Sequence, residues 1–253
     1  MRARAVLVIA VFSILACAAC TRPPAGASAL TVAAASNLTG VLQPIASAFT
    51  RRTGIPVVFS FASTAVLAQQ IENDAPFDVF AAADAVHVDA LAEKGKIVPS
   101  TRAIYARGQL ALWIPQGAHS GVRALKDLAT AQVRFIAIAQ PSAAPYGQAA
   151  VEALQASGLW EQIQPKVVYA ENIVQAKQFA ASGNADAAFT ANSLLLHEPG
   201  AVIEVDPKLY RPIDQAIGVV ASSRRAAAAL QFTQFVLGSE GRAILRSHGY
   251  GLP

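Results

Sequence analysis

The stretch Leu30-Thr31-Val32-Ala33-Ala34-Ala35-Ser36-Asn37-Leu38 decides the fold of this chain, because an apolar run of strand length passes directly into a helical pattern. Apolar residues then recur at helical spacing, at Leu38, Val41, Leu42, Ile45 and Phe49, and Thr53-Gly54 ends the pattern. A strand followed at once by an amphipathic helix is the unit of a mostly parallel sheet.

The same alternation continues to the C-terminus. Further strands are predicted at 56–61, 78–82, 109–114, 135–139, 167–170, 185–190, 201–205 and 213–220. Further helices are predicted at 64–73, 85–94, 127–130, 147–157, 174–182, 226–237 and 238–248. These units are too many for one small sheet, so we expect an α/β protein of two lobes. The strands near Leu110 and Ala216 are candidates for crossings between the lobes.

The composition indicates a folded protein without a nucleic-acid role. Of the 253 residues, 54% are hydrophobic and 14% charged, which allows a substantial core. Arg2 and Arg4 supply two of the four net positive charges. No Lys/Arg run exceeds a doublet, and no basic stripe alternates with aromatic residues, so nucleic-acid binding has little support.

The N-terminus has the pattern of an export signal. Arg2 and Arg4 precede an apolar run over 5–16, which is too short to span a bilayer comfortably. Cys17 and Cys20 are the only cysteines, so a disulfide framework or a cysteine metal site is not expected. Two processing routes remain open: lipid attachment at Cys17 or Cys20, or cleavage within 25–28. Residues 1–28 are expected to be a signal peptide and a flexible tether.

Four strand-to-helix junctions carry small or hydroxyl residues. The first turn of a helix has unpaired N–H donors and a partial positive charge, which favour an anion. At the carboxyl ends of the strands of an α/β sheet such positions gather around one ligand. The junctions are Ala35-Ser36-Asn37, Ala62-Ser63-Thr64, Pro145-Tyr146-Gly147 and Glu171-Asn172-Ile173.

Simpler interpretations of these residues exist. Ser36 and Ser63 are also ordinary helix N-caps, and Tyr146 is also an ordinary packed aromatic residue. We interpret Asp78 as structural and Asp84 as a helix cap. Catalysis is a remote alternative, because no G-x-S-x-G elbow, P-loop or metal-binding histidine spacing occurs. The four histidines, His87, His119, His197 and His248, are scattered.

Several motifs together resemble the periplasmic molybdate-binding family over residues 30–253. They are Ala33-Ala34-Ala35-Ser36-Asn37-Leu38, Phe61-Ala62-Ser63-Thr64, Pro76-Phe77-Asp78-Val79-Phe80-Ala81-Ala82-Ala83-Asp84 and Ala144-Pro145-Tyr146-Gly147. The resemblance implies a type II periplasmic-binding-protein fold, with two α/β lobes joined by a hinge and a ligand cleft between them. We expect residues 29–109 and 215–253 in one lobe and residues 110–214 in the other.

The resemblance also implies the ligand and its donors. A molybdate or tungstate oxyanion would be held by Ser36, Asn37, Ser63, Tyr146 and Ile173, with Thr64 as a neighbouring possibility. No catalysis, cofactor or free metal cation is implied, and molybdenum enters only as the oxyanion. The protein would act as a monomer in the periplasm or on the outer face of the membrane, and would deliver the anion to the permease of an ABC importer.

One position departs from the pattern of another branch of the family. That branch has a tyrosine after the strand at 185–190, where this chain has Ala191. We interpret Tyr146 as the source of the missing hydroxyl. A binding protein of the same fold for sulfate, phosphate or an organic carboxylate is the main alternative, and a carboxylate would call for an arginine such as Arg107 or Arg134. A transcriptional regulator of this fold is disfavoured by the export signal.

Overall fold

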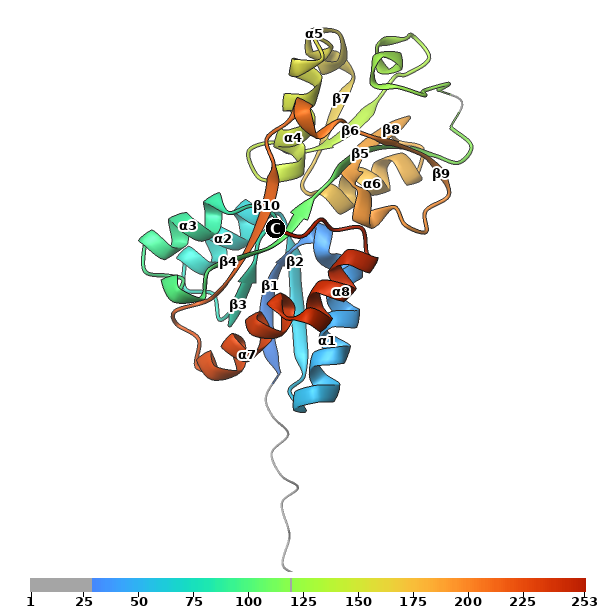
Figure 1. Ribbon diagram of the computed structural model, residues 1–253. Coiled ribbons are helices and arrows are strands. Elements are labelled where there is room, and N and C mark those ends of the chain that lie inside the picture. Colours follow the sequence, from blue (N-terminus) through green and yellow to red (C-terminus); the bar gives the residue numbers. More distant parts are fainter. Residues whose placement is uncertain (1–28, 119) are drawn as a thin grey trace, which may run out of the picture.

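The computed structural model describes residues 29–118 and 120–253, so the predicted signal peptide, tether and both cysteines lie outside the described residues. Two five-stranded sheets organise the molecule, in the orders β2-β1-β3-β10-β4 and β7-β6-β8-β5-β9 (Figure 1). Each sheet carries its own helices, and two α/β lobes result. The strands are β1 (Leu30–Ala35), β2 (Val57–Ala62), β3 (Val79–Ala81), β4 (Ala103–Gly108), β5 (Leu110–Pro115), β6 (Ile136–Ala139), β7 (Val167–Ala170), β8 (Ala187–Ala191), β9 (Gly200–Glu204) and β10 (Ile213–Val219).

The predicted helices are present, with ends that shift by one or two residues. They are α1 (Thr39–Thr53), α2 (Thr64–Glu72), α3 (Val86–Glu93), α4 (Pro145–Ala156), α6 (Ile173–Ala181), α7 (Ala226–Leu237) and α8 (Ser239–Ser247). The segment predicted as a helix at 127–130 is a 3-10 turn over Leu125–Ala129. A short helix, α5 (Trp160–Ile163), and strand β4 had no counterpart in the prediction. β4 is an edge strand whose one neighbouring strand in the sheet is β10, and its partly exposed residues lack a clear alternation.

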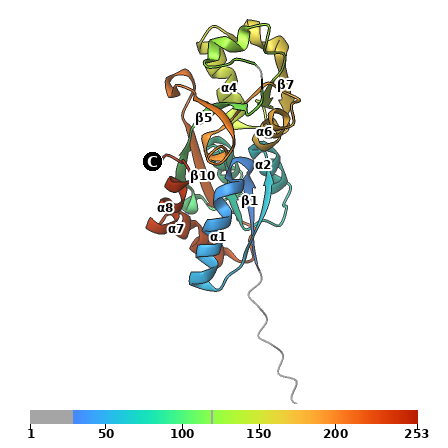
Figure 2. The same cartoon turned by 90° about the vertical axis from the view of Figure 1, so that its right-hand side faces the viewer.

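The first lobe is a mixed sheet covered on both faces. β1 pairs in parallel with β2 and β3, while β10 runs antiparallel to β3 and β4. Leu30, Val32 and Ala34 pack into one core with α1 and α7, and Ala33 packs into another with α2 and α3. Figure 2 shows α1, α7 and α8 grouped together on one side of this sheet. Burial on both faces explains why β1 is apolar at every position except Thr31.

The second lobe repeats this arrangement around β6. β6 pairs in parallel with β7 and β8, and β5 pairs antiparallel with β8 and β9. Helix α6 covers one face, where Trp113 and Ala137 are buried, and α4 covers the other, where Leu112 and Phe189 are buried. The carboxyl ends of β6 and β7 therefore lead into α4 and α6 on the same edge of the sheet.

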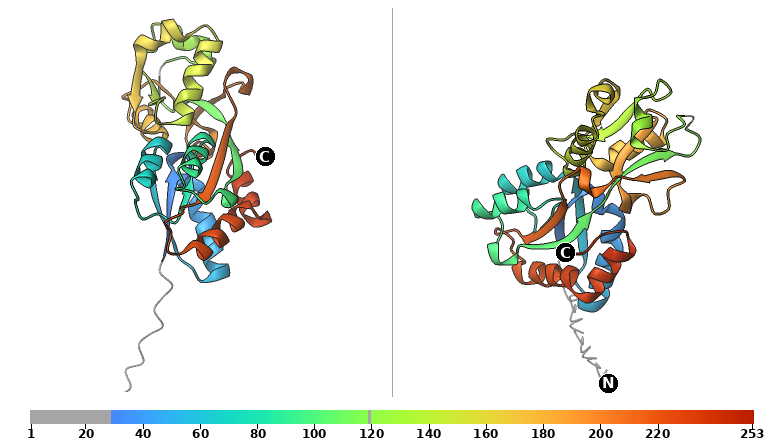
Figure 3. Two further views of the ribbon diagram at one scale, coloured as in Figure 1. Left: turned by 90° about the vertical axis from the view of Figure 1, so that its left-hand side faces the viewer. Right: turned by 45° about the horizontal axis from the view of Figure 1, so that its top comes forward.

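The chain crosses between the lobes twice. It passes from β4 to β5 through Gln109 alone, and it returns from β9 to β10 through residues 205–212 (Figure 3). The C-terminal segment lies beside the first crossing, where Gly251 and Arg107 exchange backbone hydrogen bonds of 3.0 and 2.8 Å. In the described part of the chain, no helix combines the length and the apolar character needed to span a membrane.

Candidate functional site

The two predicted serines lie side by side at the carboxyl edge of the first sheet. Ser36 follows β1 and Ser63 follows β2, and the last residues of these strands, Ala35 and Ala62, are partners in the parallel ladder. Both serines are almost fully buried, at 5% and 4% exposure. Ser63 occupies the N-cap position of α2, but its side chain makes no capping hydrogen bond. Ser36 is the first residue of η1, whose N-cap position is Ala35, and η1 also has no side-chain capping hydrogen bond, so neither serine side chain acts as a helix cap.

The predicted donors of the second lobe also occupy first turns of helices. Tyr146 is the second residue of α4 and Ile173 is the first residue of α6, and both are buried. The side chain of Asn172 caps α6 by accepting from the N–H groups of Val174 and Gln175, at 3.0 and 3.1 Å. The cap satisfies the second and third N–H groups of the helix and leaves the first, that of Ile173, outside its reach.

The structure brings these two edges together at the interface between the lobes. The short helix η1 (Ser36–Leu38), which contains Ser36 and Asn37, packs against α6, whose first residue is Ile173. The N–H of Ala65, in the first turn of α2, donates to the carbonyl of Ala143 across the interface, at 3.1 Å.

A third link between the lobes runs through side chains. Asn37 Nδ2 donates to Gln215 Oε1 at 3.0 Å, and Gln215 Nε2 donates to the Tyr146 hydroxyl at 3.0 Å. Asn37 from the first lobe and Tyr146 from the second are therefore connected through one side chain. The other three predicted residues, Ser36, Ser63 and Ile173, belong to η1 and to the starts of α2 and α6, which are elements that meet across the interface.

The donors of the interface are uncharged. Burial raises the pKa of the Tyr146 hydroxyl well above its ordinary value, with further raising by the nearby Tyr250 and Tyr210. The Tyr250 hydroxyl donates to the Asn37 carbonyl at 2.7 Å, and burial raises its pKa to about 12. Both tyrosines therefore stay protonated at physiological pH, and Tyr146, which accepts from Gln215, keeps its own proton for donation.

Several residues of the site were not identified from the sequence. Gln215, Tyr105 and Tyr250 form the buried network behind the donors. Gln215 had one usable signal, because it is a polar residue directly before the apolar run over 216–219 in a predicted strand; Tyr250 had none. Thr64, named as a neighbouring possibility, uses its Oγ1 to accept from the Ala83 N–H at 3.2 Å. The Asp84 carboxylate accepts from the His87 N–H in the first turn of α3 at 3.0 Å, but the N-cap position is Ala85, one residue later than predicted.

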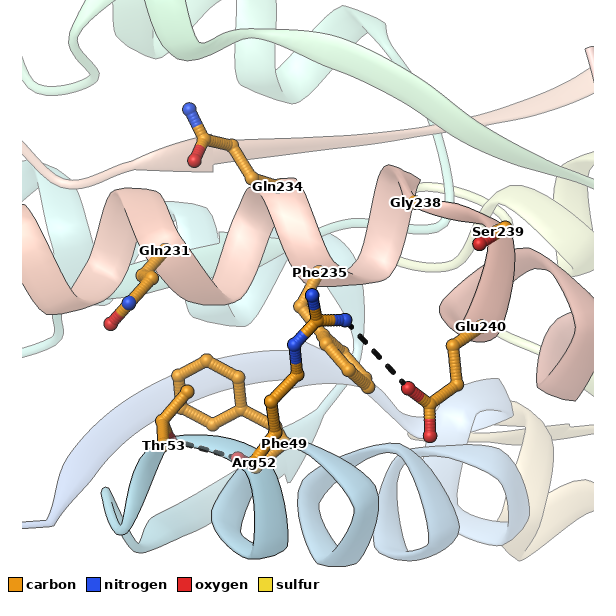
Figure 4. A pocket seen from close by; sticks show the side chains of 9 residues that line it. All are labelled: Phe49, Arg52, Thr53, Gln231, Gln234, Phe235, Gly238, Ser239 and Glu240. Atoms are coloured by element: carbon orange, nitrogen blue, oxygen red, sulfur yellow. Dashed lines mark hydrogen bonds and ion pairs between the residues drawn. The ribbon is translucent and has the colours of Figure 1, made fainter.

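A pocket of about 360 Å³ elsewhere on the first lobe does not present a set of buried, uncharged donors (Figure 4). It lies between α1, α7 and α8, and none of the five predicted residues lines it. Its one cation, Arg52, faces the Glu240 carboxylate at 3.9 Å, and the Thr53 hydroxyl donates to the Phe49 carbonyl. An anion there would meet a carboxylate, so this pocket is a poor candidate. Among the described residues no three His, Cys, Asp or Glu side chains are grouped to hold a metal ion.

Comparison with known proteins identifies the class of protein to which this chain belongs. The model of the bacterial extracellular solute-binding protein family matches residues 30–251. Molybdate-binding protein ModA of Rhodobacter capsulatus is 36% identical over 231 residues, which cover 90% of each chain. That of Azotobacter vinelandii is 36% identical over 250 residues, which cover 94% of each chain. The chain belongs to the molybdate-binding protein ModA family of these solute-binding proteins.

The same comparison in three dimensions confirms the predicted fold. The structure of the Azotobacter vinelandii periplasmic molybdate-binding protein superposes with a TM-score of 0.83 at 34% identity, covering 88% of this chain and 99% of that chain. The predicted family, the two-lobed α/β fold and the role of a binding protein, as opposed to an enzyme, are confirmed by this membership.

Proposed function

We propose that this protein captures molybdate outside the cytoplasmic membrane and delivers it to an ABC importer. The observation that carries the proposal is the meeting of buried, uncharged donors from both lobes at one interface. The relatives named molybdate-binding proteins match nearly the whole chain, which supports the same ligand here.

The ligand would be held by three hydroxyls and two backbone amides. Ser36, Ser63 and Tyr146 would donate through their side chains, and Ile173 through its N–H. The Asn37 side chain is engaged by Gln215 and Tyr250, so the backbone N–H of Asn37 is the group it can offer. Each hydrogen bond to a charged acceptor contributes about 1.5–3 kcal/mol. Five of them together offset a large part of the desolvation of a dianion.

The aromatic hydroxyl is the feature that departs from the other branch of the family. Ala191 is fully buried at the end of β8 and has no polar group to offer. Tyr146, at the junction between β6 and α4, would therefore supply the third hydroxyl beside those of Ser36 and Ser63.

The neutral character of the set supports a small inorganic oxyanion. An organic carboxylate would be expected to pair with an arginine. Arg107 instead pairs with Asp214 at 2.6 Å on the surface, and Arg134 is also exposed. Tungstate, with a charge and size close to those of molybdate, would bind to the same donors.

Transport requires the site to open and close. We propose that residues 29–109 and 215–253 move as one lobe and residues 110–214 as the other, with the two crossings as the hinge. The closed form would dock on a membrane permease as a monomer. Residues 1–28 would direct export and leave the protein either free in the periplasm or anchored through a lipid on Cys17 or Cys20.

A thermal-shift series is expected to identify the anion. Molybdate and tungstate at about 100 times their Kd should stabilise the folded protein by about 2.7 kcal/mol, because the native state alone binds them. For a chain of this size the melting temperature should rise by about 5–10 °C. Sulfate and phosphate at equal concentration serve as controls. A rise with sulfate that equals the rise with molybdate would overturn the assignment of the anion.

Molybdate affinity is expected to stay constant between about pH 7 and pH 9. The folded pKa of Tyr146 is raised by burial, so its hydroxyl remains a protonated donor below that pKa and would be lost only at a higher pH. Titration calorimetry at three pH values checks this. A steady loss of affinity above pH 8 in the native protein, absent in Tyr146→Phe, would show that Tyr146 ionises in this range.

A further inference from the structure

Gln215 is a fully buried amide at the centre of the interface between the lobes. Its Oε1 accepts from Asn37 Nδ2 at 3.0 Å and from the Tyr105 hydroxyl at 2.8 Å. Its Nε2 donates to the Tyr146 hydroxyl at 3.0 Å. Two of its three partners are residues that the proposed function places in contact with the anion.

We infer that Gln215 is a positioning residue for molybdate binding, which aims the Tyr146 hydroxyl proton at the anion and couples Tyr146 to Asn37. The inference rests on the proposed function. A phenol oxygen that accepts a hydrogen bond from an amide cannot donate its own proton along the same direction, so the proton is left for another acceptor. The Tyr146 hydroxyl can then donate to the anion. Molybdate carries no proton and can only accept hydrogen bonds, so it needs donors of this kind.

The orientation of the Gln215 amide follows from its neighbours. Asn37 presents an NH₂ group, and a reversed Gln215 would place a second NH₂ group against it, two donors facing each other. Burial of all partners makes such a mismatch costly. The amide therefore keeps its NH₂ group on Tyr146 for as long as Asn37 remains in place.

Backbone features hold this arrangement. The pairing of β10 with β4 shifts register between Gln215 and Ala216, and such a bulge re-aims a side chain. A Cβ at Gly108 would overlap the Tyr146 hydroxyl and lie 2.8 Å from Gln215 Nε2. The absence of a side chain at Gly108, at the crossing between the lobes, makes room for the bond between Gln215 and Tyr146.

A double-mutant cycle separates a positioning role from a general structural one. Molybdate Kd is measured by calorimetry for the native protein, Tyr146→Phe, Gln215→Met and the double variant. Tyr146→Phe should weaken binding about 10- to 100-fold, the value of one hydrogen bond to a charged acceptor. Gln215→Met, which has a similar volume, should weaken binding about 3- to 10-fold, as part of that contribution. Because Gln215 acts through Tyr146, the double variant should match Tyr146→Phe within about twofold.

The outcomes of the cycle have different meanings. If the loss of molybdate affinity in the double variant equals the product of the losses in the two single variants, Gln215 does not act through Tyr146. That result would overturn the positioning role without affecting the proposed function. A native protein that fails to bind molybdate would overturn the proposed function itself, and the inference with it.

Gln215→Glu tests the same inference by pH, and it keeps the shape of the side chain if Gln215→Met does not fold. A carboxylate would draw the Tyr146 proton toward itself and repel the dianion, so affinity at pH 8 should fall at least 100-fold. Lowering the pH to about 6 should restore part of it, because burial raises the pKa of such a carboxyl and returns a proton to it. Gln231→Glu, exposed on α7, controls for the added charge. A loss that does not change with pH would overturn the inference.

Discussion

Gly147→Ala is expected to lower molybdate affinity about 10- to 100-fold, since a shift of the α4 turn would break the proposed hydrogen bond of Tyr146 to the anion, which contributes about 1.5–3 kcal/mol. The first turn of α4 lies directly on the end of β6. A Cβ at position 147 would overlap the carbonyl oxygen of Ala139 and lie 2.8 Å from its carbon. Both atoms are backbone, so α4 must move as a whole and would carry Tyr146 with it. Overpacking of this kind also costs about 1–3 kcal/mol of stability.

Gly40→Ala is the matched control for Gly147→Ala. It also lies in the first turn of a helix, α1, but nothing comes within 4 Å of a Cβ built there. Alanine at this position should keep the affinity and stabilise the protein by about 0.5–1 kcal/mol. Calorimetry and thermal unfolding measure both quantities. If Gly147→Ala bound molybdate as well as Gly40→Ala, then the position of the α4 turn would not govern the site.

Asp78→Asn is expected to destabilise the protein by about 3–5 kcal/mol, the usual cost of removing one partner of a buried ion pair. The Asp78 side chain is 5% exposed, and its carboxylate accepts from the Thr31 N–H at 2.8 Å and the Ser223 hydroxyl at 2.7 Å. It also pairs with Arg225 at 2.8 Å. Asparagine would leave the Arg225 charge without a counterion and direct an NH₂ group at one of the donors.

Thermal unfolding should show a fall in melting temperature of about 10 °C for Asp78→Asn. Glu72→Gln is the control, because Glu72 pairs with Lys94 at 2.7 Å while both side chains are about half exposed. An exposed pair of this type contributes about 0–1 kcal/mol. Equal losses for the two variants would contradict a special role for burial at Asp78.

The sequence was sufficient for the fold because local signals and burial agree in most elements. β1, β7 and α7 have the bounds that were predicted, since each is a clear apolar or amphipathic run. The edge strand β4 was missed, because only one of its sides pairs with another strand and its side chains are unevenly buried. Pairing between β4 and β10, far apart in the chain, is a property of the tertiary structure.

The candidate site was predicted only in part: the proposed ligand residues were identified from the sequence, and the residues that support them were not. Ser36, Asn37, Ser63, Tyr146 and Ile173 were identified because each stands at a strand-to-helix junction, a position that the sequence reveals. Their assignment as ligands remains a proposal. The residues that position them are spread over distant elements: Tyr250 meets Asn37 from the C-terminal segment. No local pattern marks a contact of this kind, and the capping role of Asn172 was also identified only in three dimensions.

The position of the C-terminal segment has a practical consequence. Gly251 is paired with Arg107 beside the first crossing, and Tyr250 supports the Asn37 carbonyl. Residues 250 and 251 thus contact both the first crossing and the strand-to-helix junction at Asn37. A fluorescent dye attached near Gly251 would report ligand capture if the lobes move as proposed, whereas removing residues 250–253 would take away the Tyr250 support of Asn37.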